Sequence, residues 1–211
     1  MEGSVLPSGT TFHGRSDDGS GAFGGISSQP KGEGPTEKKP IGENLLKSPA
    51  FDDGPNGWST GKNPPTVEYR IAENEGDSHG RAALIQKTEN KYFPISDWTQ
   101  KIDYNNDAPV IELSAQVKAK DVTKAILDVL FLDDKGEWIK HEWVSYIGDQ
   151  SDDPKPLTHD WKEYKGAVAI PPKTKTIVIG LQDYGPGTIM FDDVSAVFLK
   201  ELPKEPNNVS K

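Results

Sequence analysis

The stretch Val110-Ile-Glu-Leu-Ser-Ala-Gln-Val-Lys118 alternates strictly between apolar and polar side chains. This two-residue period predicts a β-strand with one buried face and one polar face. The run from Lys124 to Leu132 is apolar on both faces apart from Asp128, which places it inside a sheet. The turn signal Asp133-Asp-Lys-Gly136 then predicts a hairpin, with a return strand from Trp138 to Tyr146.

Similar strand signals, separated by turn residues, fill the rest of the chain, and no segment predicts a helix convincingly. The other strand candidates are Asn44–Phe51, Thr66–Glu73, Arg81–Lys87, Asp97–Asp103, Trp161–Ile170, Lys175–Gln182 and Thr188–Leu199. Short strands at regular spacing are typical of antiparallel sandwiches and barrels. We therefore predict an all-β fold, an antiparallel β-sandwich of the jelly-roll kind.

Composition divides the 211 residues into three parts. Gly, Ser and Pro make up nearly half of residues 1–42, and apolar residues there are isolated. Such a segment buries too little surface to offset the entropy of ordering it, which predicts a flexible leader or linker. The sandwich is expected over residues 43–202, followed by a polar tail over residues 203–211.

Charge and composition exclude several classes of protein. The net charge of −9 argues against a nucleic-acid binder, which needs basic surface to neutralise phosphates. No apolar run approaches the roughly 20 residues of a membrane span, and the first residues lack the pattern of a secretory signal. The absence of cysteine excludes disulfides, thiolate metal sites and thiol nucleophiles.

The two ends of the predicted sandwich carry recognisable motifs. The first is Gly42-Glu-Asn-Leu-Leu-Lys-Ser-Pro-Ala-Phe-Asp-Asp-Gly-Pro-Asn-Gly-Trp58, and the last is Gly187-Thr-Ile-Met-Phe-Asp-Asp-Val-Ser-Ala-Val-Phe198. With Val110–Lys118 and Trp161-Lys-Glu-Tyr-Lys-Gly-Ala-Val-Ala-Ile-Pro171 between them, they resemble the galactose-binding-like β-sandwich family of carbohydrate-binding modules. The resemblance implies a non-catalytic, monomeric module of a larger extracellular or cell-surface protein. The same sandwich also serves purely structural roles.

The end motifs also predict a structural calcium site. The apolar residues change parity at Asp192-Asp193, which predicts a β-bulge at two adjacent carboxylates. Asp52 lies at the end of the first predicted strand, and first and last strands are commonly neighbours in such sandwiches. Oxygen ligands from Asp52, Asp192 and Asp193 would suit Ca²⁺, and modules of the resembling family hold a structural calcium at about this place. The alternative is that these acids cap turns or face water.

No known catalytic motif occurs in the chain. His141-Glu142 lacks the second histidine of a zinc-protease helix, and there is no nucleophile elbow or P-loop. Paired acids on alternate positions of one strand, as in jelly-roll glycanases, are also missing. Glu112 and Asp128 are the carboxylates expected to share one side of a sheet.

Aromatic side chains are the candidates for binding sugar, because flat rings stack on the C–H faces of a sugar. Trp58 and Trp161 belong to the family-like motifs and are expected in the core. Trp98, Trp138, Trp143 and Tyr184 lie near strand ends and are the candidate ring platforms, with Trp138 and Trp143 expected on opposite faces because five positions separate them. The polar partners expected to support them are Gln116, Asp128 and Gln182.

These observations predict a module that binds a neutral poly- or oligosaccharide, since an acidic domain repels acidic polysaccharides. Two alternatives stay open. The first is a structural or protein-interaction sandwich without a sugar site, and the second is a small jelly-roll glycan hydrolase or lyase.

Overall fold

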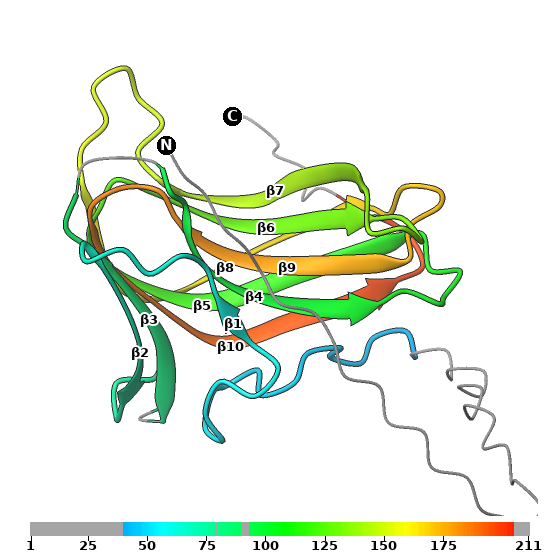
Figure 1. Cartoon of the computed structure of the whole chain (residues 1–211), viewed down its shortest axis with the longest axis horizontal. Coiled ribbons are helices and arrows are strands. Elements are labelled where there is room, and N and C mark those ends of the chain that lie inside the picture. Colours follow the sequence, from blue (N-terminus) through cyan, green and yellow to red (C-terminus); the bar gives the residue numbers. More distant parts are fainter. Residues whose placement is uncertain (1–39, 79, 90–92, 205–211) are drawn as a thin grey trace, which may run out of the picture. The chain divides into compact units, whose positions relative to one another are not determined.

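The computed structural model describes residues 40–78, 80–89 and 93–204. Within these residues there is no helix, and hence none long and apolar enough to cross a membrane. Ten strands of the described part of the chain form two five-stranded antiparallel sheets, so the predicted antiparallel β-sandwich is confirmed (Figure 1). Predictions for residues 1–39 and 205–211, including most of the leader and the tail, lie outside the described residues.

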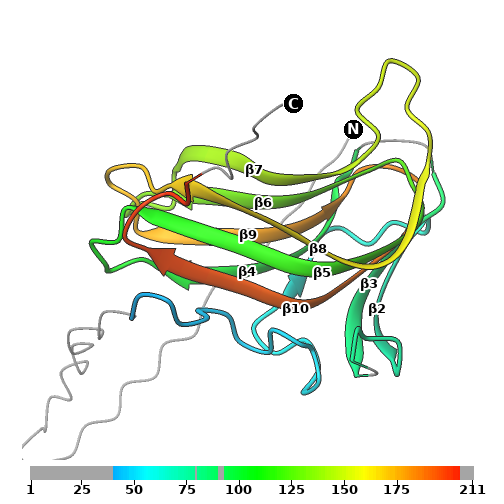
Figure 2. The same ribbon diagram turned by 180° about the vertical axis from the view of Figure 1, so that it is seen from behind.

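The sheets are named here after their central strands. The β9 sheet, in front in Figure 1, has the order β1 (Ser59–Thr60), β4 (Ser96–Asp103), β9 (Thr176–Asp183), β6 (Lys124–Leu132) and β7 (Trp138–Gly148). The β10 sheet, in front in Figure 2, has the order β2 (Val67–Glu73), β3 (Arg81–Lys87), β10 (Gly187–Leu199), β5 (Val110–Val122) and β8 (Leu157–Ala169).

The core lies between the sheets and is built from alternate residues of their strands. On β5 the buried apolar residues are those that the sequence predicts, namely Ile111, Leu113, Ala115 and Val117. The polar residues between them are half-buried on the outer face of the sheet. On β6 the inward set consists of Ala125, Leu127, Val129 and Phe131. Because side chains alternate between faces, Asp128 of β6 lies on the outer face of the β9 sheet.

The prediction of a first strand over Asn44–Phe51 is wrong. Asn44 makes only one isolated bridge, with Val197, and Ser48 and Phe51 have positive φ angles of 46° and 56° that break an extended chain. The segment is instead tied down by the Asn44 side chain, whose Oδ1 accepts hydrogen bonds from the backbone N–H groups of Leu46 (3.2 Å) and Ala196 (3.1 Å).

The two tryptophans expected in the core behave differently. Trp58 is buried, packs on Phe51 with ring centroids 5.3 Å apart, and donates its indole N–H to the carbonyl of Ser48. Trp161 is only half-buried on β8, at the edge of the β10 sheet, so the prediction of a core position for it is wrong.

Candidate functional site

Three aromatic rings form a row on the outer face of the β9 sheet, and we call Trp138, His141 and Trp143 the platform. All three project from β7, opposite Leu132, Leu130 and Asp128 of β6 respectively. The ring centroids of Trp138 and His141 are 5.4 Å apart, and those of His141 and Trp143 are 6.4 Å apart. Trp138 is 67% exposed and Trp143 is 48% exposed, so both present open ring surface.

Two irregularities in β7 bring these rings to one face. The pairing register with β6 shifts between Phe131 and Leu132, and again between Leu127 and Asp128. At the first shift Phe131 pairs with Lys140, but the next residue, Leu132, pairs with Trp138. Ile139 is therefore an extra residue on β7 without a partner position on β6. A β-bulge of this kind changes the side on which the following residues point. The prediction that Trp138 and Trp143 face opposite sides is therefore wrong.

A buried polar network lies beside the platform. Gln182 on β9 donates from Nε2 to Oδ2 of Asp128 at 3.2 Å, and Tyr184 donates its hydroxyl to Oε1 of Gln182 at 3.0 Å. The other carboxylate oxygen of Asp128 lies 3.5 Å from Nδ1 of His141 and has no hydrogen-bond partner. Asp128 and Gln182 thus lie together next to the rings.

Burial makes Asp128 an unusual carboxylate. The loss of solvent raises its pKa to about 6, although the neighbouring His141 acts to lower it. The negative charge of Asp97 on β4 also acts to raise the pKa of Asp128. The pKa of Asp97 is itself raised by burial. The polar part of this face therefore changes its charge within the mildly acidic range.

Tyr184 and Lys124 support the platform from one end. The ring of Tyr184 is only 6% exposed and lies 6.1 Å from that of Trp143, so the expectation of an open platform at Tyr184 is wrong. The Lys124 ammonium lies 3.9 Å from the centroid of the Trp143 ring and 4.4 Å from that of Tyr184. These cation–π contacts hold the Trp143 ring in place.

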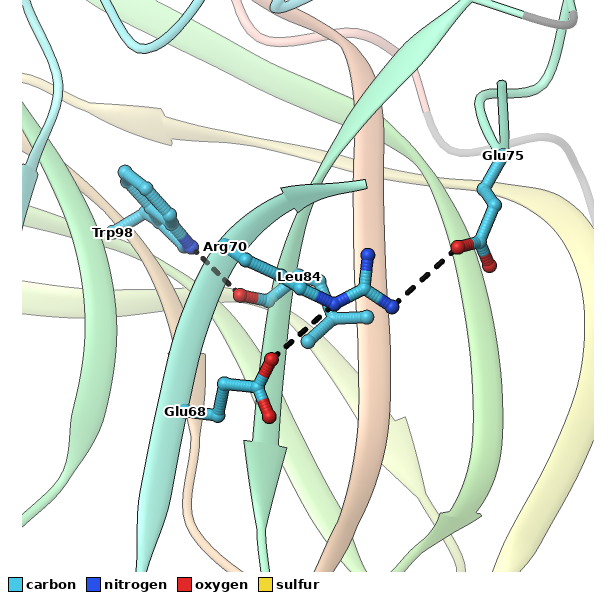
Figure 3. Close-up of polar contacts among 5 residues, drawn as sticks. All are labelled: Glu68, Arg70, Glu75, Leu84 and Trp98. Carbon is cyan, nitrogen blue, oxygen red and sulfur yellow. Dashed lines mark hydrogen bonds and ion pairs between the residues drawn. The ribbon is translucent and has the colours of Figure 1, made fainter. Parts of the chain in front are cut away.

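Trp98 is a core residue and not a platform, which corrects the sequence prediction. It is 5% exposed and donates its indole N–H to the carbonyl of Leu84 at 3.3 Å, which Figure 3 shows. Its ring packs edge-on against Tyr69 with centroids 6.0 Å apart. On β4, Trp98 points to the same inner side as Gln100 and Ile102. It is therefore buried, although it lies near the start of the strand.

Gln116 and Glu112 lie on the other sheet. Both project from the outer face of β5 in the β10 sheet, so neither shares a face with Asp128. The expected pairing of Glu112 with Asp128 is therefore wrong, and Gln116 does not support the platform. The outer side of the β10 sheet carries ion pairs such as those of Arg70 with Glu68 and Glu75, each 3.4 Å long (Figure 3).

The predicted β-bulge at the paired aspartates is confirmed, since the register of β10 against β5 shifts between Asp192 and Ser195. Asp192 is buried, and its carboxylate accepts hydrogen bonds from the backbone N–H groups of Asp77 (2.9 Å) and Asp193 (2.7 Å). Asp193 itself is exposed, and Asp52 accepts from the N–H of Arg81 at 3.3 Å.

A metal site is not evident from these side chains alone. Among the described residues, no three acidic or histidine side chains are grouped so that they could hold a metal ion. The surroundings are nevertheless rich in oxygen. A Cβ atom on Gly76 would lie 2.7 Å from both the carbonyl oxygen of Arg81 and Oδ2 of Asp192. Burial raises the pKa of Asp192, the backbone N–H groups of Asp193 and Asp77 act to lower it, and the charges of Asp193 and Asp52 act to raise it.

Comparison with known proteins identifies the fold. No family model matches the chain, and no curated protein matches its sequence. One similar solved structure is that of xylanase 10B from Clostridium thermocellum, which contains a family 22 carbohydrate-binding module and a GH10 module and is complexed with xylohexaose. It aligns with a TM-score of 0.57 at 16% identity, over 75% of this chain and 29% of that chain. The family 22 xylan-binding domain of Xyn10C from Paenibacillus barcinonensis aligns with a TM-score of 0.53 at 14% identity over 76% of this chain and 97% of that domain.

A third match is the enzymatically active domain of tailspike protein 4 from bacteriophage CBA120, with a TM-score of 0.56 at 15% identity over 74% of this chain. This chain spans 21% of the length of the tailspike chain and 29% of that of the Clostridium xylanase. At such identities the likeness shows the fold. The described domain shares the β-sandwich fold of these solved carbohydrate-binding modules, which is the fold that its end motifs predict.

Sequence reasoning missed His141 and Lys124 as part of this face. A signal for His141 was available in principle, because it is flanked by the two predicted tryptophans on one strand. The signal depends on the bulges of β7, however, and a regular alternation assigns His141 and Trp138 to opposite faces.

Proposed function

We propose that the chain is a non-catalytic carbohydrate-binding module that binds a neutral poly- or oligosaccharide on the platform. The observation that carries this proposal is the pair of exposed tryptophan rings, Trp138 and Trp143, beside the hydrogen-bonded Asp128 and Gln182. Large aromatic side chains left in water cost free energy that burial would recover, and their grouping on one face marks a binding surface.

The chemistry of the platform suits a sugar. Its rings offer flat apolar surface to the C–H groups of a pyranose, while the carboxylate and amide beside them are planar groups that match pairs of hydroxyls. The solved neighbours favour the same class of ligand, because two of them contain modules described as binding xylan or as complexed with xylohexaose.

A neutral ligand follows from charge. The chain carries a net charge of −9, and Asp97 and Asp128 add acidic groups to the face that bears the platform. Acidic polysaccharide would be repelled by this field. Catalysis is not part of the proposal, because the two carboxylates that share this face are on strands separated by β9 and Asp128 is engaged with Gln182.

Affinity electrophoresis in gels that contain xylan, β-1,4-galactan or β-glucan tests the proposal. We expect retardation in at least one gel, weakened in Trp138→Ala and Trp143→Ala and retained in Trp161→Ala, which removes a half-buried tryptophan from the other sheet. Migration unchanged in every gel would favour a structural or protein-interaction sandwich. Release of reducing sugar or of unsaturated product would identify a hydrolase or lyase instead.

We also propose a structural Ca²⁺ at the Asp192 bulge. It is supported by the oxygen-rich surroundings of Asp192, where the carbonyl of Arg81 and the carboxylate of Asp52 lie close by. Carbonyl and carboxylate oxygens are the ligands that calcium prefers. The role of such an ion would be to fasten residues 74–78 to β10, without contact with the platform.

A further inference from the structure

The platform ends at a cavity of about 670 Å³ beside Trp143. On one side the cavity is bounded by Trp143 and Tyr146 of β7 and by Thr123, the residue just before β6. On the other side it is bounded by the loop of residues 149–156, which joins β7 to β8 and appears as the yellow loop in Figure 1. A volume of this size is ample for a small ligand.

The loop that bounds the cavity is held in shape by Asp149. Its carboxylate accepts hydrogen bonds from the backbone N–H groups of Ser151 at 2.9 Å and Lys155 at 3.0 Å. These bonds lower the pKa of Asp149, so the loop stays fastened at neutral pH. A wall held in this way costs little further ordering when a ligand binds against it.

The loop also supplies polar groups to the cavity. Gln150 and Ser151 line it, and Gln150 is exposed. An amide both donates and accepts hydrogen bonds, so Gln150 can bond to the hydroxyl groups of a sugar. Next to it, the rings of Trp143 and Tyr146 provide an apolar wall.

We propose that this cavity holds the terminal sugar of a glycan chain whose following sugars stack along Trp143 and Trp138. This inference rests on the proposed function and adds that the module recognises chain ends. A sugar inside a chain has glycosidic bonds on two sides and needs an open path at both, whereas the loop of residues 149–156 closes one side. A terminal sugar needs only one path, and its free hydroxyl at the closed side meets Gln150 of the loop.

The opposite end of the platform is open enough for the rest of the glycan to extend beyond it. Trp138 is the most exposed of the three platform rings, at 67%, and lies at the start of β7. The glycan would therefore enter over Trp138, pass Trp143 and end in the cavity.

Calorimetry with neutral β-1,4-linked hexasaccharides of xylose, glucose and galactose tests this directly. Whichever one binds is compared with two end-modified forms, one reduced to the alditol and one methylated on the non-reducing terminal hydroxyl. We expect one of these modifications, and not the other, to weaken binding at least ten-fold. Partial hydrolysis of the matching polysaccharide should also raise the amount of protein bound per gram, because it creates ends.

Two variants separate the cavity from the platform. Gln150→Ala should weaken binding of the intact hexasaccharide several-fold with an unchanged melting temperature, and Gln116→Ala on the β10 sheet should have no effect. If both modified forms bind like the parent and capacity does not follow the number of ends, while Trp143→Ala still weakens binding, chain-end recognition is wrong and the proposed function stands. If no hexasaccharide or polysaccharide binds at all, both are wrong.

Discussion

Trp138 and Trp143 lie on one face of β7 although five positions separate them, because Ile139 is an extra residue opposite β6. In a regular strand, an odd separation places two side chains on opposite faces. The irregular pairing of one edge strand thus creates the aromatic row, with His141 between the two tryptophans. Edge strands tolerate such bulges because only one side is paired.

Truncation of the platform is expected to reduce binding without unfolding the domain. Trp138→Ala and Trp143→Ala should each weaken glycan binding several-fold, since stacking contributes about 0.5–1.5 kcal/mol beyond the burial of area. Trp98→Ala should instead destabilise the fold by about 3–5 kcal/mol, because Trp98 is buried. Melting curves and binding isotherms of the three variants distinguish the roles, and equal loss of stability in all three would contradict the assignment.

The close packing of β7 on β8 is expected to be sensitive at Gly166. A Cβ atom there would lie 2.3 Å from the carbonyl oxygen of Val144 and 2.9 Å from its Cγ1. Gly166→Ala should therefore push Val144 outward, lower the melting temperature and weaken binding through the adjacent Trp143. Lys165→Ala, at the neighbouring and more exposed position, is the matched control. An unchanged melting temperature in Gly166→Ala would show that β7 moves freely.

The sequence predicts the architecture well because alternation reports which face of a strand is buried. All strands of the two sheets except β1 were predicted within a few residues, and the parity change at Asp192 correctly indicated a bulge. Asn44–Phe51 failed because its apolar residues fill the core from a loop, with φ angles that no strand adopts.

The candidate site is harder to predict, because it depends on which sheet each strand joins. Gln116 and Gln182 have similar polar positions on their strands, yet they lie in different sheets. Trp98 and Trp138 both lie near strand ends, and only the inward parity of β4 separates the buried one from the exposed one. Neither distinction is present in a single sequence without the pairing of the strands.

Stability is expected to depend on pH through Asp183. Burial raises the pKa of this carboxyl to about 7, although the Lys87 charge and the N–H of Gly185 oppose the shift. Because the folded pKa lies above the unfolded value near 4, the folded state favours the neutral acid, and this stabilisation is lost as pH rises from about 4 through about 7. Asp183→Asn should therefore melt with a weaker dependence on pH between about 4 and about 7. An identical dependence in both proteins would exclude Asp183 as its source.

Calcium is expected to raise the melting temperature without being needed for the platform rings. An ion that binds only the folded state stabilises it by RT ln(1 + [L]/Kd), so the shift should grow with the logarithm of the calcium concentration. Asp192→Asn should abolish the shift, because it removes charge from the buried carboxylate beside Asp52 and Asp193.

Asp134→Asn, in the turn between β6 and β7, is the control, and it should respond to calcium like the parent. The glycan affinity of Asp192→Asn should stay within about two-fold of the parent, since the bulge is on β10 and the platform is on β7. Melting curves that coincide in chelator and in millimolar calcium, after removal of metal from the unfolded protein, would rule out the site. A loss of glycan affinity in step with the loss of calcium would instead place the ion at the sugar.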